Sequence, residues 1–190
     1  MATAAPITTG SRSDDPPARW LDAEERATWL GLLRVMTRLP AVLDARLTRE
    51  AGLTLFEYTV LAMLSEQPDG ALRMSRLAAV TNASPSRLSH AARQLEAGGH
   101  LVRAPDPYDG RCIRAVLTPR GRHLVEAAAP GHVAAVRALV VDPLTGGELR
   151  ALRLAVDRIL DQIDPEGTTD PDGSGRSTTT EPDPRPRGAR

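Results

Sequence analysis

The sequence predicts a mainly α-helical protein with a small β-hairpin wing, in which a winged helix-turn-helix core is flanked by dimerisation helices. Three observations support this fold class. A capped polar helix and a two-stranded hairpin follow each other between Ser84 and Gly121. A short helix and a tight turn precede them, which is the helix-turn-helix pattern. Long amphipathic helices are expected on both sides of this stretch.

The N-terminal part combines an expected leader with one long helix. Residues 1–19 contain Ala, Thr, Ser, Asp and Pro without periodicity, so we expect them to be disordered. Asp22 and Glu25 have the spacing of a capping box, and apolar residues then recur at helical spacing. We expect Pro40 to kink this helix and Gly52 to end it.

The winged core is expected over about residues 54–121. Thr54 and Glu57 form a second capping box, which opens a helix to about Glu66. After a turn, a short helix from Met74 should lead into the polar helix.

The polar helix begins at Ser84, which can cap free backbone amides, and Pro85 fits its first position because no amide hydrogen is needed there. Gly98-Gly99 should end it. One face is apolar, and the other carries hydrogen-bonding groups without acids. The candidate DNA contacts are Ser84, Ser86, Arg87, His90 and Arg93.

Arg87 is the preferred candidate for a base contact, because a guanidinium can pair with guanine through two hydrogen bonds. The alternative is that these side chains form an ordinary solvated helix face.

Two short strands should follow, and they form the hairpin. The strands are expected at Leu101–Arg103 and Ile113–Leu117. In the loop between them, Arg111 is a candidate contact to the minor groove or to phosphate. Alternatively, Arg111 pairs with Asp106 or Asp109 inside the hairpin. We expect Asp106, Asp109 and Arg103 to support the wing, with Asp109 holding an arginine in place.

The C-terminal region repeats the same signals. Thr118-Pro119 should begin a helix that bends at Pro130-Gly131 and continues to about Val141. A third capping box at Thr145 opens a last amphipathic helix. Residues 164–190 lack apolar periodicity and are expected to be a disordered tail.

The first and last helices carry more apolar surface than a winged core of about 60 residues can cover. We therefore expect a domain over residues 20–163 whose two ends form a homodimer interface. The alternative is that these helices complete a single larger helical core.

The charge distribution favours nucleic acid although the net charge is zero. Residues 71–122 contain nine arginines and three acids, which gives a local balance of +6. Local charge governs contact with phosphate, so the neutral total does not exclude DNA.

Other classes of protein are not supported. The chain has no glycine-rich phosphate loop, no nucleophile elbow and no catalytic cluster, so we expect no enzyme and no cofactor. The histidines lack metal-ligand spacing, and one cysteine excludes an intramolecular disulfide. Cys112 is either a small strand residue or a reactive thiol whose pKa nearby arginines lower. A winged helix used only for protein contact would favour acids where this chain has arginines.

No signal-peptide core and no apolar run of membrane length is evident, so we expect a cytoplasmic protein without a membrane partner.

The sequence from about Ala27 to Ile163 resembles the MarR family of bacterial transcription regulators. The resemblance rests on several motifs together. These are the helix-turn-helix from Met74, Leu95-Glu96 with Gly99-His100-Leu101-Val102-Arg103, the wing DPYDGR at Asp106–Arg111, and Leu117-Thr118-Pro119-x-Gly121.

The resemblance implies a triangular homodimer with one winged helix on each lobe, bound to a pseudo-palindromic operator. Such proteins commonly repress genes and release DNA when a small phenolic or lipophilic acid binds. An apolar ligand would then occupy a cleft between dimer helices and winged lobe, near Phe56 and Tyr58, unless both residues only pack in the core. The alternative is an effector-independent regulator or an activator.

Two departures from the family pattern matter. The family wing often reads Asp-x-Arg-Asp-x-Arg, whereas the third position here is Tyr108, so Arg111 becomes the stronger candidate for the minor groove. The oxidation-sensing branch carries a reactive cysteine in its first helix, whereas Cys112 lies in the wing. Redox sensing by that mechanism is therefore not supported.

Overall fold

The computed structural model describes residues 19–165 and residue 167. The leader and tail expected from the sequence therefore lie almost entirely outside the described residues. The chain divides into two compact units between Arg38 and Leu39.

The first helix, α1 (Ala23–Ala51), begins at the capping box expected from the sequence. The Glu25 amide donates to Asp22 Oδ1 at 2.8 Å, and the Asp22 amide donates to Glu25 Oε2 at 2.9 Å. The helix continues through Pro40, and Gly52 ends it with a φ of 67°. A left-handed φ of this kind is easy only for glycine.

Three helices of the winged core follow. They are α2 (Leu55–Ser65), α3 (Met74–Val80) and α4 (Pro85–Ala97). Of these, α2 and α4 begin at the caps that the sequence predicted. The second capping box is confirmed, because the Glu57 amide donates to Thr54 Oγ1 at 3.2 Å and the Thr54 amide donates to Glu57 Oε2 at 2.9 Å.

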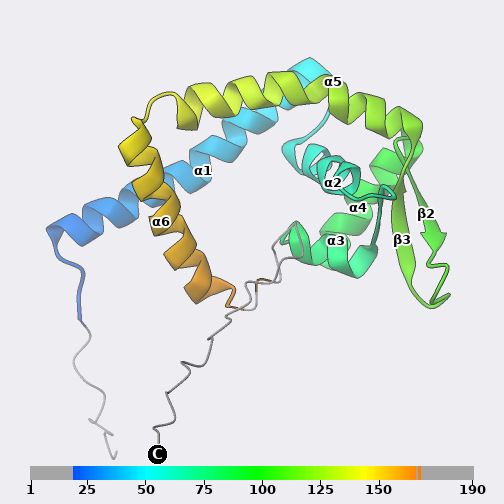
Figure 1. Ribbon diagram of the computed structural model, residues 1–190, viewed down its shortest axis with the longest axis horizontal. Coiled ribbons are helices and arrows are strands. Elements are labelled where there is room, and N and C mark those ends of the chain that lie inside the picture. The colour runs from blue at the N-terminus through cyan, green and yellow to red at the C-terminus, as the bar shows by residue number, and fades with distance from the viewer. Residues whose placement is uncertain (1–18, 166, 168–190) are drawn as a thin grey trace, which may run out of the picture. The chain divides into compact units, whose positions relative to one another are not determined.

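The described chain forms an antiparallel sheet of three strands, in the order β1-β3-β2 (Figure 1). The hairpin consists of β2 (Leu101–Pro105) and β3 (Ile113–Leu117). The third strand, β1 (Ala71–Arg73), pairs with β3 and was not expected from the sequence, which predicted a turn up to Ala71 and then the helix from Met74. Three residues are too few to show the alternation that identifies a strand.

The helix after the sheet, α5 (Pro119–Val136), starts against the backbone of His100. Thr118 donates its amide to the His100 carbonyl oxygen at 3.1 Å and caps α5 through the Gly121 amide at 3.0 Å. A Cβ at Gly121 would lie 1.9 Å from that same carbonyl oxygen, so only glycine fits.

The structure differs from expectation further along this helix. It continues through Pro130, and the departure from α-helical hydrogen bonding comes later, in a π-helical turn, η1 (Arg137–Val141). The last helix, α6 (Gly146–Ile163), begins with the expected capping box at Thr145.

The stretch Pro119–Val141 is long and apolar enough to cross a membrane by length and composition, with a mean hydropathy of 1.5. No stretch of this kind was expected from the sequence. Of the most apolar window of this stretch, 17% is buried, and Val125 and Ala128 belong to the core cluster that also contains α2 residues.

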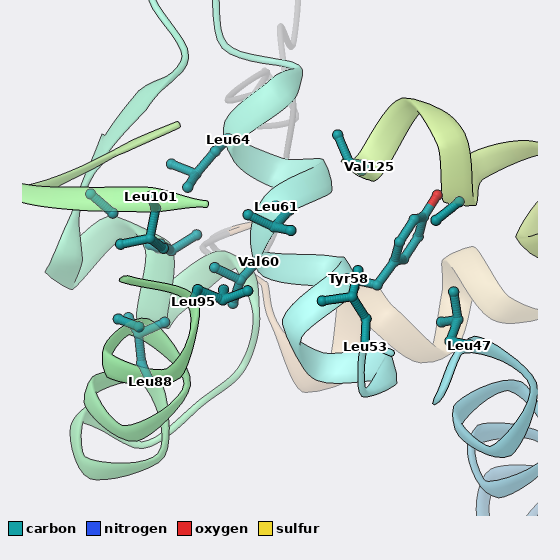
Figure 2. Close-up of a cluster of buried hydrophobic side chains, with 14 residues drawn as sticks. Leu47, Leu53, Tyr58, Val60, Leu61, Leu64, Leu88, Leu95, Leu101 and Val125 are labelled. Atoms are coloured by element: carbon teal, nitrogen blue, oxygen red, sulfur yellow. The ribbon is translucent and has the colours of Figure 1, made fainter. Parts of the chain in front are cut away.

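The core is built around α2, whose side chains reach the other elements in Figure 2. Val60, Leu61 and Leu64 have no exposed surface. They pack in one cluster with residues of α4, β2 and α5, namely Leu88, Leu95, Leu101 and Val125. Because α4 and the hairpin share this core, their exposed faces are held in fixed positions relative to each other.

Candidate nucleic-acid interface

The start of α4 is organised by its cap. The Arg87 amide donates to Ser84 Oγ at 3.3 Å, and the hydroxyl oxygens of Ser84 and Ser86 lie 3.2 Å apart. Pro85 takes the first helical position. The helix ends at Gly98, and the left-handed residue of the expected glycine pair is Gly99, with a φ of 71°.

The outer face of α4 carries all of the candidate DNA contacts that the sequence predicted on this helix. Its inner face is fixed by Leu88, Ala91, Ala92 and Leu95, which are buried. Ser84, Ser86, Arg87, His90 and Arg93 are all exposed. Within the described residues, no carboxylate lies within ion-pair distance of Arg87 or Arg93, so both cations remain available to an external anion.

Arg87 has a neighbour that the sequence did not reveal. Its guanidinium lies over the Phe56 ring, with 4.2 Å between the guanidinium carbon and the ring centroid. A cation–π contact of this kind orients the side chain without neutralising its charge. Arg87 therefore connects the outer face of α4 to the first turn of α2.

The hairpin loop is built on Asp106, which is only 6% exposed. Its Oδ2 accepts a hydrogen bond from Arg73 Nε at 2.8 Å, and its Oδ1 accepts from the amides of Tyr108 and Asp109 at 2.9 and 3.2 Å. The hydrogen bond from Arg73 is the main cause of a lowered pKa at the Asp106 carboxyl. Asp106 thus supports the wing by joining the loop to β1.

Asp109 orders the other side of the loop. Its Oδ1 accepts from the Arg111 amide at 3.2 Å, and its Oδ2 accepts from the Cys112 thiol at 3.3 Å. Asp109 therefore holds Arg111 through the backbone, and neither wing carboxylate pairs with the Arg111 side chain. That side chain is exposed on the loop.

Of the two interpretations of Cys112, the structure contradicts the reactive thiol whose pKa nearby arginines lower. The hydrogen bond to Asp109 is the largest influence and raises the pKa of the thiol, with burial acting in the same direction. Arg73 has an opposing but smaller effect. A raised pKa favours the protonated thiol, which is the less nucleophilic form.

Arg103 supports the hairpin at its base. Its amide donates to Glu96 Oε1 at 3.0 Å, and its Nε and Nη2 donate to Glu96 Oε2 at 3.0 and 2.7 Å. Hydrogen bonding to Arg103 lowers the pKa of Glu96. This pair ties β2 to the last turn of α4, so the strand and the helix are positioned together.

The sequence did not reveal two of these supporting residues. Arg73 and Glu96 were not recognised as part of the interface, and Phe56 was considered only as a residue of the ligand cleft. Arg73 lies 33 positions before its partner Asp106, and a separation of that size has no signal in spacing. The spacing of Glu96 and Arg103, seven positions apart, was readable as a helix end facing the next strand.

A cleft of about 720 Å³ lies beside the candidate interface. It is lined by residues of the C-terminal half of α1, of α2 and of α4, with Thr81 from the turn. The lining residues are Pro40, Ala41, Asp44, Thr54, Leu55, Phe56, Glu57, Thr59, Thr81, Arg87, His90 and Ala91. Of the two residues considered for such a cleft, Phe56 lines it, whereas Tyr58 packs in the core, which was the alternative for both. The Tyr58 ring contacts the His132 ring, with 4.5 Å between the ring centroids and 42° between the ring planes.

Both carboxylates of the cleft have partners within the chain. Asp44 Oδ1 accepts from the Leu55 amide at 2.7 Å, and Glu57 is held in the capping box by Thr54. Arg87 has no such acidic partner among the described residues, so the uncompensated charge of the cleft is positive. The described part of the chain contains no cluster of three or more His, Cys, Asp or Glu placed to hold a metal ion.

Comparison with known proteins gives consistent matches. The sequence profile of the MarR family matches residues 51–111. The HTH-type transcriptional repressor Rv2887 of Mycobacterium tuberculosis is 33% identical over 108 residues, which cover 57% of this chain and 76% of that protein.

Two solved structures are also similar. The MarR family regulator Sco3205 of Streptomyces coelicolor, solved in complex with DNA, is 38% identical with a TM-score of 0.75, over 80% of this chain and 94% of that one. CouR of Rhodococcus jostii RHA1, solved with bound p-coumaroyl-CoA, is 25% identical with a TM-score of 0.63, over 73% of this chain and 92% of that one.

Proposed function

This chain belongs to the MarR family of transcription regulators, and we propose that it represses transcription as a homodimer bound to a pseudo-palindromic operator. We further propose that it leaves the DNA when a small aromatic or lipophilic acid binds. The family consists of DNA-binding regulators, not enzymes. As such a regulator, the protein would act in the cytoplasm.

The observation that carries the proposal is the pairing of α4 with the hairpin on one core. The helix offers Ser86, His90 and Arg93 on an exposed face, and the loop offers Arg111. A helix of this kind fits the major groove, where base edges are distinguishable, and a basic loop fits the neighbouring minor groove. Sco3205, a relative with 38% identity, was solved in complex with DNA.

The homodimer is proposed from the apolar surface of α6, a helix on which no residue is buried. Seven large apolar side chains of this helix are exposed. They are Leu149, Leu152, Leu154, Val156, Ile159, Leu160 and Ile163. Exposed apolar surface of this extent is expected to be covered by a partner, and two-fold pairing of one chain with itself matches a pseudo-palindromic DNA site.

The effector is proposed to bind in the cleft beside α4. Phe56 offers an aromatic face there, and Arg87 offers a positive charge that no described carboxylate neutralises. An aromatic acid would place its ring against Phe56 and its carboxylate at the guanidinium. CouR, a more distant relative, was solved with p-coumaroyl-CoA bound.

Effector binding would act on DNA binding in two ways. It would engage Arg87, which is also the candidate base contact on α4. It would also change the separation of the two α4 helices in the dimer, which must match half-sites about 34–36 Å apart. Either change weakens DNA binding only if the effector binds the DNA-free protein more tightly than the DNA-bound protein.

The test of DNA binding starts from genomic fragments of the source organism selected by the pure protein. We expect one operator class that contains an inverted repeat, and an affinity that falls steeply with salt because arginine–phosphate contacts release counterions. Arg87→Ala should weaken binding by roughly 1–3 kcal/mol and relax base preference at one position in each half-site. Binding that stays flat between low and physiological salt would contradict the proposal.

The effector is tested by titrating salicylate, other aromatic acids and p-coumaroyl-CoA into the protein–operator complex. We expect at least one of them to release the DNA and to raise the melting temperature of the free protein. Arg87→Ala should lose this thermal stabilisation, whereas Arg93→Ala, a matched change on the same helix outside the cleft lining, should keep it. If none of these ligands has either effect, the effector-independent regulator is the better description.

A further inference from the structure

Tyr108 has the largest exposed fraction, 93%, among the large hydrophobic residues that the structure describes. It lies in the loop between β2 and β3, at the end of the hairpin away from α5 (Figure 1). Single exposed apolar residues are common on protein surfaces, so exposure alone decides nothing. What distinguishes Tyr108 is the support beneath it and the charge beside it.

The backbone at Tyr108 is held in place from below. Its amide donates to Asp106 Oδ1 at 2.9 Å, and the other oxygen of the same carboxylate accepts from Arg73 on β1. Pro105 and Pro107 restrict the backbone on either side of Asp106. The ring is therefore presented from a loop that is ordered without any ligand, which lowers the entropy cost of making a contact.

The surroundings of the ring fit a nucleic-acid groove. The Arg111 side chain is exposed on the same loop, and the Asp109 carboxylate is occupied by the Arg111 amide and the Cys112 thiol. The minor groove offers hydrogen-bond acceptors on its floor, apolar sugar edges on its walls and a strong negative potential where it is narrow. An aromatic ring with a hydroxyl donor beside an uncompensated guanidinium complements all three features.

We propose that Tyr108 enters the minor groove next to Arg111, where its ring packs against deoxyribose and its hydroxyl donates to a base-edge acceptor. The inference rests on the proposed operator binding and adds an uncharged contact to it. Part of the affinity of this wing is therefore independent of salt, and the contact discriminates A·T from G·C pairs, whose minor-groove amino group blocks the ring.

The first experiment measures operator affinity across a salt series, by fluorescence anisotropy, for full-length wild type, Tyr108→Ala, Tyr108→Phe and Tyr108→Arg. We expect Tyr108→Ala to weaken binding roughly tenfold, as for the removal of one specific groove interaction, with an unchanged slope of log affinity against log salt. Tyr108→Phe should show only part of this effect. Tyr108→Arg should steepen the slope by about one unit for each wing because each new phosphate contact releases counterions.

The matched control is His123→Ala, which removes another exposed ring from α5, beyond the opposite end of β3; its side chain is 84% exposed. We expect wild-type affinity for it. Because Tyr108 is exposed, all three substitutions should leave the melting temperature unchanged, so a loss of binding cannot be a loss of folding.

The second experiment locates the contact in the minor groove. Replacing adenine with 2,6-diaminopurine, one A·T pair at a time, adds an amino group to the minor groove and leaves the major-groove edge intact. We expect one such pair in each half-site to weaken binding of the wild type roughly fivefold or more and to leave binding of Tyr108→Ala unaffected, because the added amino group and the substitution disrupt the same interaction.

The inference is overturned if Tyr108→Ala binds like the wild type, if its weaker binding comes with a flatter salt slope, or if diaminopurine weakens binding of both proteins equally. A wild-type protein that binds no duplex would instead refute the proposed function, which separates the two failures.

Discussion

At the scale of single residues, the sequence revealed the side chains that act locally and missed those that act across the chain. The caps at Ser84, Thr54 and Thr145 were readable, because a cap and its amide lie within three residues of each other. Arg73 was not readable as the partner of Asp106, because only the pairing of β1 with β3 brings them together.

The buried carboxylate of Asp106 leads to the first prediction. Asp106→Ala removes the acceptor of Arg73 Nε and of the Tyr108 amide, and it leaves the Asp109 amide only the Asp106 carbonyl oxygen at 3.3 Å. We expect the melting temperature to fall by several degrees and operator affinity to fall roughly tenfold, because the wing residues proposed to contact DNA are no longer held in place. Calorimetry and anisotropy measure the two effects.

The control for this prediction is Asp142→Ala, which removes an exposed carboxylate that pairs with Arg137 at 2.7 Å. It should change neither quantity appreciably, since exposed ion pairs contribute little. An Asp106→Ala protein with wild-type operator affinity would show that the hydrogen bonds of the Asp106 carboxylate are not required for DNA binding.

At the scale of elements, the helices with caps were predicted to within a few residues, whereas two short or irregular elements were not. The strand β1 is too short to show periodicity. The π-helical turn η1 was expected to be α-helical, with the irregularity at Pro130 instead. A π turn differs from an α turn in its hydrogen bonding, and composition does not encode that difference.

The contact between α5 and His100 leads to the second prediction. Gly121→Ala would place a methyl group 1.9 Å from the His100 carbonyl oxygen, where backbone cannot give way cheaply. We expect the free energy of unfolding to fall by about 3 kcal/mol or more, the upper end for overpacking. Urea denaturation measures this decrease.

Gly110→Ala is the matched control, since nothing lies within 4 Å of a Cβ at Gly110 and its φ is not left-handed. We expect it to be nearly neutral. Equal effects of the two substitutions would mean that α5 moves away from the sheet without cost.

The packing of α2 against α5 leads to a prediction on pH. The His132 ring contacts the Tyr58 ring, and burial lowers the pKa of the His132 imidazole. Below the usual histidine pKa the unfolded chain takes up this proton before the folded chain does, so folded stability is complete above that value and falls as the pH drops through it. We expect a lower melting temperature at about pH 5.5 than at about pH 7.5.

In His132→Gln this pH dependence should be smaller, whereas the exposed His123→Gln on the same helix should retain it in full. A residual dependence is expected from His100, whose pKa burial also lowers. An unchanged profile in His132→Gln would exclude the α2–α5 contact as the source.

At the scale of the whole molecule, the sequence predicted a fold class that the mainly helical structure and its relatives share. The local excess of arginine pointed correctly to DNA in spite of a net charge of zero. What the sequence could not supply was the identity of the surface that covers the apolar faces, because a chain's pattern of apolar residues does not distinguish its own core from a second copy.

The exposed surface of α6 leads to the last prediction. We expect light scattering at micromolar concentration to give twice the mass of the chain. Leu152→Asp with Leu160→Asp should give a monomer with weaker operator binding, because the two half-sites are then bound independently. Truncation after Asp164 should preserve both dimer and DNA binding. A monomeric wild-type protein would instead support the alternative that the first and last helices complete a single larger helical core.

The pairing of β1 with β3 has a consequence for how the protein opens. It joins Ala71 to Val116 and so closes a loop that contains α3, α4 and β2. Within this loop α3 contacts α4, β1 and β3, and α4 contacts β2, so each of these elements is stabilised by the others. In native-state hydrogen exchange, amides of α3, α4 and the sheet should therefore become unprotected together, as one cooperative unit. The amides of α6, which has no buried residue, should exchange earlier than these in the free monomer. Their exchange should slow when the proposed partner copy covers that helix.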